Sequence, residues 1–205
     1  MTILVSNVTA LWPRINRTYK FDANENKSVP CDAQDPLAAY ELSFEMTKDS
    51  ARALWDSMCE AYNAKKQAGW PDKPVNPFKQ TDEGTFIGKA KLKGNYNGEL
   101  TKKPLQVDAS NKKLGDDFML TTGSKINLAV TPVPYNMREA GVSLRLSAVQ
   151  VVEYKPMEET NPFGEVKGFS APASDPFGLP ETKAAPAGGL SDLDDEIPFA
   201  PEWRI

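Results

Sequence analysis

Apolar and polar residues alternate along several segments of the first 155 residues, a pattern typical of strands that bury one face. In the clearest segment, Tyr40, Leu42 and Phe44 alternate with polar residues. The first segment is expected to end at Pro13, because proline cannot donate to a sheet ladder. The pattern predicts a mainly β body, with strands at residues 2–12, 40–46, 86–93, 126–130 and 141–154.

The last segment is the longest strand signal in the chain. Its alternation places four side chains toward the interior, namely Val142, Leu144, Leu146 and Ala148. The alternation is lost around residues 149–152. This change indicates either a bulge or burial of both faces where a small barrel closes.

A single helix is predicted after the second strand. Asp49 or Ser50 can cap its start, and its apolar face continues to about Gln67, with Gly69 as the stop. Its aromatic side chains are expected to pack in the core. Three prolines within residues 70–80 then predict an extended connection.

The character of the chain changes abruptly after Lys155. Residues 156–205 hold 8 of the 17 prolines, and the pair PF recurs in NPFGE, DPFGL and EIPFA. Such a tract cannot bury enough apolar area to offset the entropy of ordering, so we expect a flexible tail at 156–205 behind a folded domain at 1–155. The PF repeats are either docking points for a partner or parts of a proline-rich spacer.

Charge divides the chain at the same place. Residues 1–155 carry 21 Lys and Arg against 18 Asp and Glu, a net of +3, and residues 156–205 carry 3 against 10, a net of −7, which together give the −4 of the whole chain. In LSDLDDEIPF, at 190–199, four carboxylates run into an apolar plug that suits a basic groove with hydrophobic pockets. The residues of this tip are Asp192, Asp194, Asp195, Glu196, Ile197, Pro198 and Phe199.

The chain contains no histidine and two isolated cysteines, Cys31 and Cys59. The commonest general base and most zinc or iron ligand sets are therefore missing, and we expect neither catalysis nor a metal or other cofactor. The cysteines form no CxxC pair and are expected to be reduced thiols. With no signal peptide and no run of about 20 apolar residues, the sequence predicts a cytoplasmic protein that does not enter membranes.

The body carries a basic and aromatic surface that such a tail would fit. Within 86–93, three lysines fall on the face opposite Ala90 and Leu92, at a spacing close to the phosphate repeat of an extended single strand. A lysine row is also common on a solvated or edge face, so this segment alone leaves both interpretations open. Tyr96 lies at the tip of a predicted NYNG hairpin, and Tyr135 and Arg138 are expected in the loop after 126–130.

Aromatic rings can stack on bases while cations meet phosphates, so the surface suggests binding of single-stranded nucleic acid. The stacking candidates are Trp12, Tyr19, Phe21, Tyr96 and Tyr135. The phosphate-binding candidates are Arg14, Lys20, Lys89, Lys91, Lys93, Arg138 and Arg145.

These segments together resemble phage-encoded replicative single-stranded DNA-binding proteins of the OB-fold kind. The resemblance rests on the opening NVTALWPRI, the capped helix after an early strand, the final GVSLRLSAVQVVEY, and the tip DDEIPF, which is similar to the acidic tip of bacterial single-stranded DNA-binding proteins. It covers nearly the whole chain. It implies an OB-fold-like five-stranded barrel with one attached α-helix and a flexible tail.

The resemblance also implies a function. The domain would bind single-stranded DNA without sequence preference in phage DNA replication, recombination or repair. The tail would recruit replication or repair enzymes such as a polymerase, helicase or nuclease. Without DNA, the acidic tip is expected to sit transiently in the basic groove, and bound DNA is expected to displace it.

Two features depart from these families. APEWRI follows Phe199, so the terminal phenylalanine carboxylate that partners of the bacterial proteins read is missing, which leaves the choice of partner open. The predicted helix follows the second strand, whereas the usual OB-fold places it between the third and fourth strands. Self-association through an exposed strand edge also stays open.

Other functions remain as alternatives. A protein-interaction adaptor would use the PF repeats, while its lysines only solvate the barrel. A metal-dependent nuclease would need Asp108, Asp116 and Asp117, but adjacent strand residues point to opposite faces and make a poor metal site. A carbohydrate- or RNA-binding barrel would use the same stacking surface.

Overall fold

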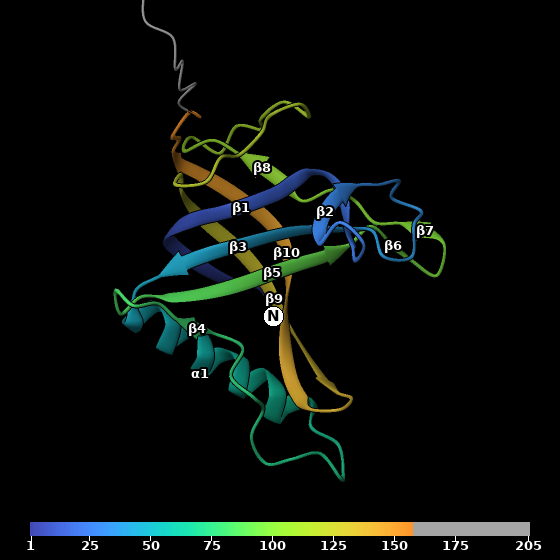
Figure 1. The fold of residues 1–205 in the computed structure, drawn as a ribbon. Coiled ribbons are helices and arrows are strands. Elements are labelled where there is room, and N and C mark those ends of the chain that lie inside the picture. The colour runs from blue at the N-terminus through green and yellow to red at the C-terminus, as the bar shows by residue number, and fades with distance from the viewer. Residues whose placement is uncertain (158–205) are drawn as a thin grey trace, which may run out of the picture. The chain divides into compact units, whose positions relative to one another are not determined.

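The structure is a computed structural model that describes residues 1–157. Five long strands form a closed barrel (Figure 1): β1 (Ile3–Asp22), β3 (Ala39–Met46), β5 (Phe86–Lys93), β9 (Lys125–Asn136) and β10 (Ala140–Glu153). Around the barrel they follow the order β1–β3–β5–β10–β9, and β9 pairs again with β1. Neighbours are antiparallel except β5 and β10, which run parallel. This five-stranded barrel has the OB-fold architecture, which confirms the predicted fold class.

Several short strands pair with the barrel strands or form a hairpin beyond them. β2 (Lys27–Pro30) folds back on the end of β1, β4 (Lys79–Gln80) pairs antiparallel with the start of β5, and β8 (Leu105–Val107) runs parallel to β10. β6 (Asn95–Tyr96) and β7 (Glu99–Leu100) form a hairpin beyond the end of β5. Asn97 and Gly98 at its tip both have positive φ, 52° and 86°, as a tight hairpin turn requires, so the predicted NYNG hairpin is confirmed.

The barrel interior is filled by the inward-facing residues of each strand. On β3 the alternation predicted from sequence is confirmed, because Tyr40, Leu42, Phe44 and Met46 are buried and the residues between them are less so. On β5 the buried residues are Gly88, Ala90 and Leu92. Gly88 lies so close to the Phe44 ring that an added Cβ would come within 2.8 Å of it.

One helix, α1 (Lys48–Lys65), packs at the end of the barrel and buries Ala51, Leu54, Met58 and Tyr62 (Figure 1). Its N-cap is Thr47, whose side chain accepts a hydrogen bond from the Ser50 amide, so neither cap residue expected from the sequence is the observed one. The helix lies between β3 and β5, the second and third barrel strands, as the sequence order indicated. It is not long and apolar enough to cross a membrane.

The first strand does not end at Pro13. β1 continues to Asp22, and its pairing with β3 shifts register between Leu11 and Arg14. Trp12 has a φ of +43° there, a rare backbone conformation for a bulky side chain. This irregularity accommodates Pro13 within the strand and bends it. Residues 14–21, which were expected to follow the first strand, therefore form its second half.

β9 and β10 also differ from the sequence-based expectation. β9 runs on through Pro132 and Pro134, where it pairs only with β10 and loses no hydrogen bond to β1. Tyr135 is therefore a strand residue rather than a loop residue. In β10 the register shifts between Leu146 and Ala148, so Ala148 is not the inward residue predicted, and Val149 is buried instead.

Candidate nucleic-acid interface

A groove of about 760 Å³ lies on the outer face of the barrel, across β1, β3 and β5. It brings together six of the twelve DNA-binding residues predicted from the sequence: Arg14, Tyr19, Lys20, Phe21, Lys89 and Lys91. Five further residues line it that sequence reasoning did not single out: Asn26, Lys27, Ser28, Leu37 and Glu41.

The floor of the groove is a cross-strand cluster of charges. Lys89 and Lys91 point outward from β5, because they alternate with buried Ala90 and Leu92. Glu41 on β3 lies opposite Lys91 on one side and opposite Arg14 on the other. The Lys89 and Lys91 ammonium groups each lie 3.0 Å from a Glu41 carboxylate oxygen, and the Arg14 guanidinium lies 4.0 Å away.

The environment of Glu41 keeps its carboxylate charged. Burial acts to raise the pKa of Glu41, but hydrogen bonds and charge from Lys89 and Lys91 outweigh that effect, and the pKa lies below its ordinary value of 4.5. The groove floor therefore holds three cations and one anion at neutral pH. No local pattern marked Glu41 as a site residue, because its neighbours come from other strands.

Aromatic side chains form one wall of the groove. Phe21 is 59% exposed and faces the same hollow as Tyr19 and the exposed Leu37. The guanidinium groups of Arg14 and Arg17 lie 5.9 and 5.6 Å from the centre of the Tyr19 ring. A large ring left in water beside cations offers a surface on which a planar, electron-rich group can stack.

Lys20 lines the groove but is paired. Its ammonium lies 2.7 Å from the Asp35 carboxylate, and this hydrogen bond raises the pKa of Lys20 and lowers that of Asp35. Asp35 also accepts a hydrogen bond from the Leu37 amide. Lys20 is therefore held by the β1–β3 connection and is less available to an incoming phosphate than its charge alone suggests.

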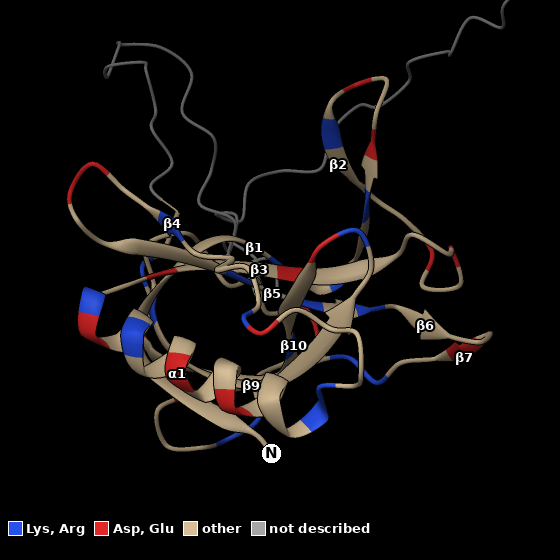
Figure 2. Cartoon of the chain, turned by 90° about the horizontal axis from the view of Figure 1, so that it is seen from below, with Lys and Arg blue, Asp and Glu red and all other residues tan. Residues whose placement is uncertain are grey.

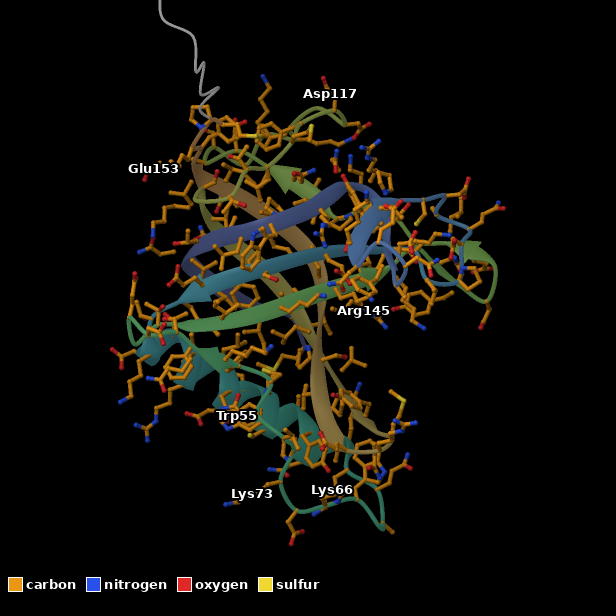
Figure 3. The ribbon with its side chains drawn as sticks, viewed as in Figure 1. Trp55, Lys66, Lys73, Asp117, Arg145 and Glu153 are labelled. Carbon is orange, nitrogen blue, oxygen red and sulfur yellow. The ribbon has the colours of Figure 1, made fainter. Side chains whose placement is uncertain are left out.

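A second group adjoins the groove at the end of β5. Arg145 on β10 lies opposite Lys91 across the parallel pair of strands. The Arg145 guanidinium is 5.3 Å, and the Lys93 ammonium 5.9 Å, from the centre of the Tyr96 ring. Figure 3 shows Arg145 at the end of the barrel that carries β2 and the β6–β7 hairpin, away from Trp55 on α1. Three more predicted residues thus continue the basic and aromatic surface.

Trp12 lies in a neighbouring hollow of about 350 Å³, lined mainly by apolar residues that include Met119 and Met157. Its side chain is 62% exposed, and its amide donates to the Thr122 hydroxyl. Arg14 lines both this hollow and the groove. The two surfaces therefore adjoin each other at Arg14.

Two predicted residues, Tyr135 and Arg138, belong neither to the groove nor to the surfaces that adjoin it. Tyr135 packs over Gly141, where an added Cβ would lie 2.5 Å from the Tyr135 hydroxyl. Arg138 follows Tyr135 in the turn between β9 and β10. The tail residues Asp192 to Phe199 lie outside the described part of the chain.

The acidic residues considered for a nuclease are held in turns. Asp108 accepts a hydrogen bond from the Lys112 amide, and Asp116 pairs with Lys113 at 3.2 Å. Asp116 and Asp117 lie in a turn, not on a strand as expected. Within residues 1–157, no three Cys, Asp or Glu side chains gather in a way that would hold a metal ion. Cys31 and Cys59 are both free thiols.

No profile of a known protein family and no curated protein sequence matches the chain. Among solved structures, the single-stranded DNA-binding protein of bacteriophage Enc34, in complex with single-stranded DNA, superposes with a TM-score of 0.54 at 17% identity, over 76% of this chain and 88% of that one. The C-terminally truncated Enc34 protein gives a TM-score of 0.54 at 16% identity, over 76% and 87% of the two chains.

The single-stranded DNA-binding protein gp2.5 of bacteriophage T7 superposes with a TM-score of 0.51 at 21% identity, over 80% of this chain and 98% of that one. The resemblance found in the sequence is confirmed at the level of the fold: the chain has the fold of phage single-stranded DNA-binding proteins.

Proposed function

We propose that this protein binds single-stranded DNA without sequence preference, in the groove across β1, β3 and β5. The observation that carries this proposal is the convergence of Arg14, Lys89 and Lys91 in one open groove with the half-buried ring of Tyr19 and the exposed ring of Phe21. β3 and β5 are the second and third strands of the barrel. That face and the loop after the first strand are the surfaces through which OB-folds bind oligonucleotides.

The geometry suggests how a strand would lie. Alternate residues of a strand are roughly 6.6–6.8 Å apart, close to the phosphate repeat of an extended single strand, so Lys89 and Lys91 would follow successive phosphates. Phe21 and Tyr19 would stack on bases, each stack contributing about 1–3 kcal/mol. Such contacts read no base edge, which favours sequence-independent binding.

The bound strand would extend in two directions from this floor. In one direction Arg14 adjoins the hollow that contains Trp12. In the other direction Lys91 lies beside Arg145, which contacts Tyr96. The structural neighbour from bacteriophage Enc34 was solved in complex with single-stranded DNA, which supports DNA as the ligand here. Tyr135 and Arg138 would contact DNA only if the strand reached the β9–β10 hairpin.

We further propose a role in phage DNA replication, recombination or repair in the host cytoplasm, by binding rather than catalysis. The tail would recruit replication or repair enzymes. Its four carboxylates, Asp192, Asp194, Asp195 and Glu196, and the apolar plug Ile197–Phe199 match a basic site that has a hydrophobic pocket.

The test is binding of fluorescent oligo-dT and of duplex DNA at several salt concentrations, with a doubly substituted variant. Lys89→Gln/Lys91→Gln should weaken oligo-dT binding about tenfold or more and reduce the slope of log K against log salt by about 1.4, because two phosphate contacts are lost. Lys48→Gln/Lys65→Gln on α1 is the matched control, since it removes the same charge far from the groove.

Two results would contradict the proposal. One is equal weakening by both double variants, which would show only an effect of net charge. The other is the absence of any preference for oligo-dT over duplex, which would favour an adaptor that works through its PF repeats.

A further inference from the structure

Glu41 occupies the centre of the basic groove. Each of its two carboxylate oxygens is bound by a different lysine, at 3.0 Å, and Arg14 lies 4.0 Å away on the opposite strand. The side chain is only 17% exposed, so these partners enclose it. Three strands that are distant in sequence therefore supply one anion and the cations around it.

This arrangement is an anion site that the chain already fills. Two ammonium groups and a guanidinium around two oxygens are also the donors that a phosphate group would meet. The carboxylate reduces the charge of the floor from +3 for Arg14, Lys89 and Lys91 to +2 for the four residues together. It also directs one donor of each lysine toward the protein.

We propose that Glu41 competes with DNA phosphate for the lysines of the groove and so limits the affinity for single-stranded DNA. The inference rests on the proposed function. Each lysine ammonium has three donors and can serve the carboxylate and a phosphate at once, so Glu41 does not prevent binding. Its negative charge repels the phosphate at close range. It also neutralises part of the positive charge of the lysines in the free protein.

The consequence is a groove that depends on stacking as much as on charge. Lysines without a paired carboxylate raise the affinity for any polyanion, whereas exposed rings raise the affinity only for nucleic acid with unpaired bases. A carboxylate among the cations weakens the first kind of binding and leaves the second unchanged. A lower affinity would also let other enzymes displace the protein from single-stranded DNA.

The chain offers a matched control on the same strand. Glu45 lies on the same outer face of β3 as Glu41 but is paired in register with Ile87 and Thr9. Its carboxylate accepts a hydrogen bond from the Thr85 hydroxyl, and within the described residues no lysine or arginine pairs with it. Glu45→Gln therefore makes the same chemical and net-charge change outside the cation cluster.

The test compares oligo-dT affinity of the full chain, Glu41→Gln and Glu45→Gln across a salt titration. Glu41→Gln should bind about tenfold more tightly at low salt, since one like charge a few ångströms from phosphate is removed. Its slope of log K against log salt should steepen by about 0.7, the value for one additional phosphate interaction on a single strand. Glu45→Gln should stay within about twofold of the original.

Unchanged or weaker binding by folded Glu41→Gln would overturn the inference and show that Glu41 holds the lysines in place for DNA. Equal tightening by both variants would also overturn it, because net charge would then explain the effect. If Glu41→Gln does not fold, Glu41→Thr, which is neutral and favours strands, takes its place. Failure of the original chain to bind oligo-dT would instead contradict the proposed function itself.

Discussion

The groove and the α1 side of the barrel use similar residues in opposite ways. On the α1 side, Tyr62 packs on Trp70 with ring centres 5.5 Å apart, and Trp55 meets Phe78 edge-on at 6.3 Å. In the groove and beside it, large rings such as that of Phe21 remain in water. The first set of rings packs ring against ring beside the core, whereas the rings of Tyr19 and Tyr96 contact only cations in the described part of the chain.

Charged residues show the same contrast. The outer face of α1 carries charges of both signs, visible as blue and red segments in Figure 2. In the groove, cations from different strands converge on the single carboxylate of Glu41. Similar residue types are thus dispersed on one surface and gathered on the other, and the difference arises from which strands the fold places side by side.

The largest expected effect is on stability, at the α1 side. Tyr62 is fully buried, and its hydroxyl donates to the Pro71 carbonyl at 2.9 Å. Tyr62→Ala should lower the free energy of unfolding by about 3–5 kcal/mol through the cavity it leaves. Tyr62→Phe, which loses only the hydrogen bond, should cost about 1 kcal/mol. Urea unfolding measures both, and equal losses would contradict this role of the ring.

The matching change in the groove should affect binding and spare stability. Phe21→Ala should weaken oligo-dT binding by about 1–3 kcal/mol, the contribution of one stacked base. Its free energy of unfolding should change by no more than about 0.5 kcal/mol, because the ring is exposed. Leu4→Ala, at an exposed apolar residue outside the groove, is the control and should leave affinity unchanged.

Removal of the tail should produce a smaller effect on the same surface. A chain ending at Lys155 loses a segment with a net charge of −7. It should bind oligo-dT several-fold more tightly at low salt, and the difference should fade as salt screens the charges. Fluorescence anisotropy across a salt titration measures this. An affinity that does not change with tail removal at any salt concentration would rule out competition by the tail.

The smallest effect concerns pH. The folded-state pKa of Glu41 is lowered, so its interactions stabilise the protein above the ordinary value of 4.5 and are lost as the pH falls through the lowered pKa. Glu41→Gln should thus be less stable than the original chain at pH 7, by less than about 1 kcal/mol, and the gap should narrow in acid. Melting temperatures from pH 7 to pH 3 test this, and a gap that widens in acid would contradict it.

Sequence patterns predicted what depends on neighbours along the chain. The outward row of Lys89, Lys91 and Lys93 follows from strand alternation, and the hairpin around Tyr96 follows from its turn residues. The β3 strand rests on an equally local signal. These features need no knowledge of which strands pair.

The features that the sequence did not reveal depend on pairing. Glu41 looked like any polar residue on an alternating strand until β1 and β5 were placed on either side of it. Pro13 suggested an end to the first strand, because nothing local shows that a bulge at Trp12 will absorb it. Tyr135 was expected in a loop, but it lies in β9, which continues past its pairing with β1 because it still pairs with β10.

The position of α1 between β3 and β5 bears on how the domain assembles. These two strands are neighbours in the barrel, yet the helix and a proline-containing connection separate them in the chain. Pairing β3 with β5 closes a loop and costs conformational entropy. Glu41 therefore contacts Lys89 and Lys91 only after this loop has closed. A nascent chain still lacking β5 therefore has neither Lys89 nor Lys91, and the groove is complete only after synthesis and folding have passed this point.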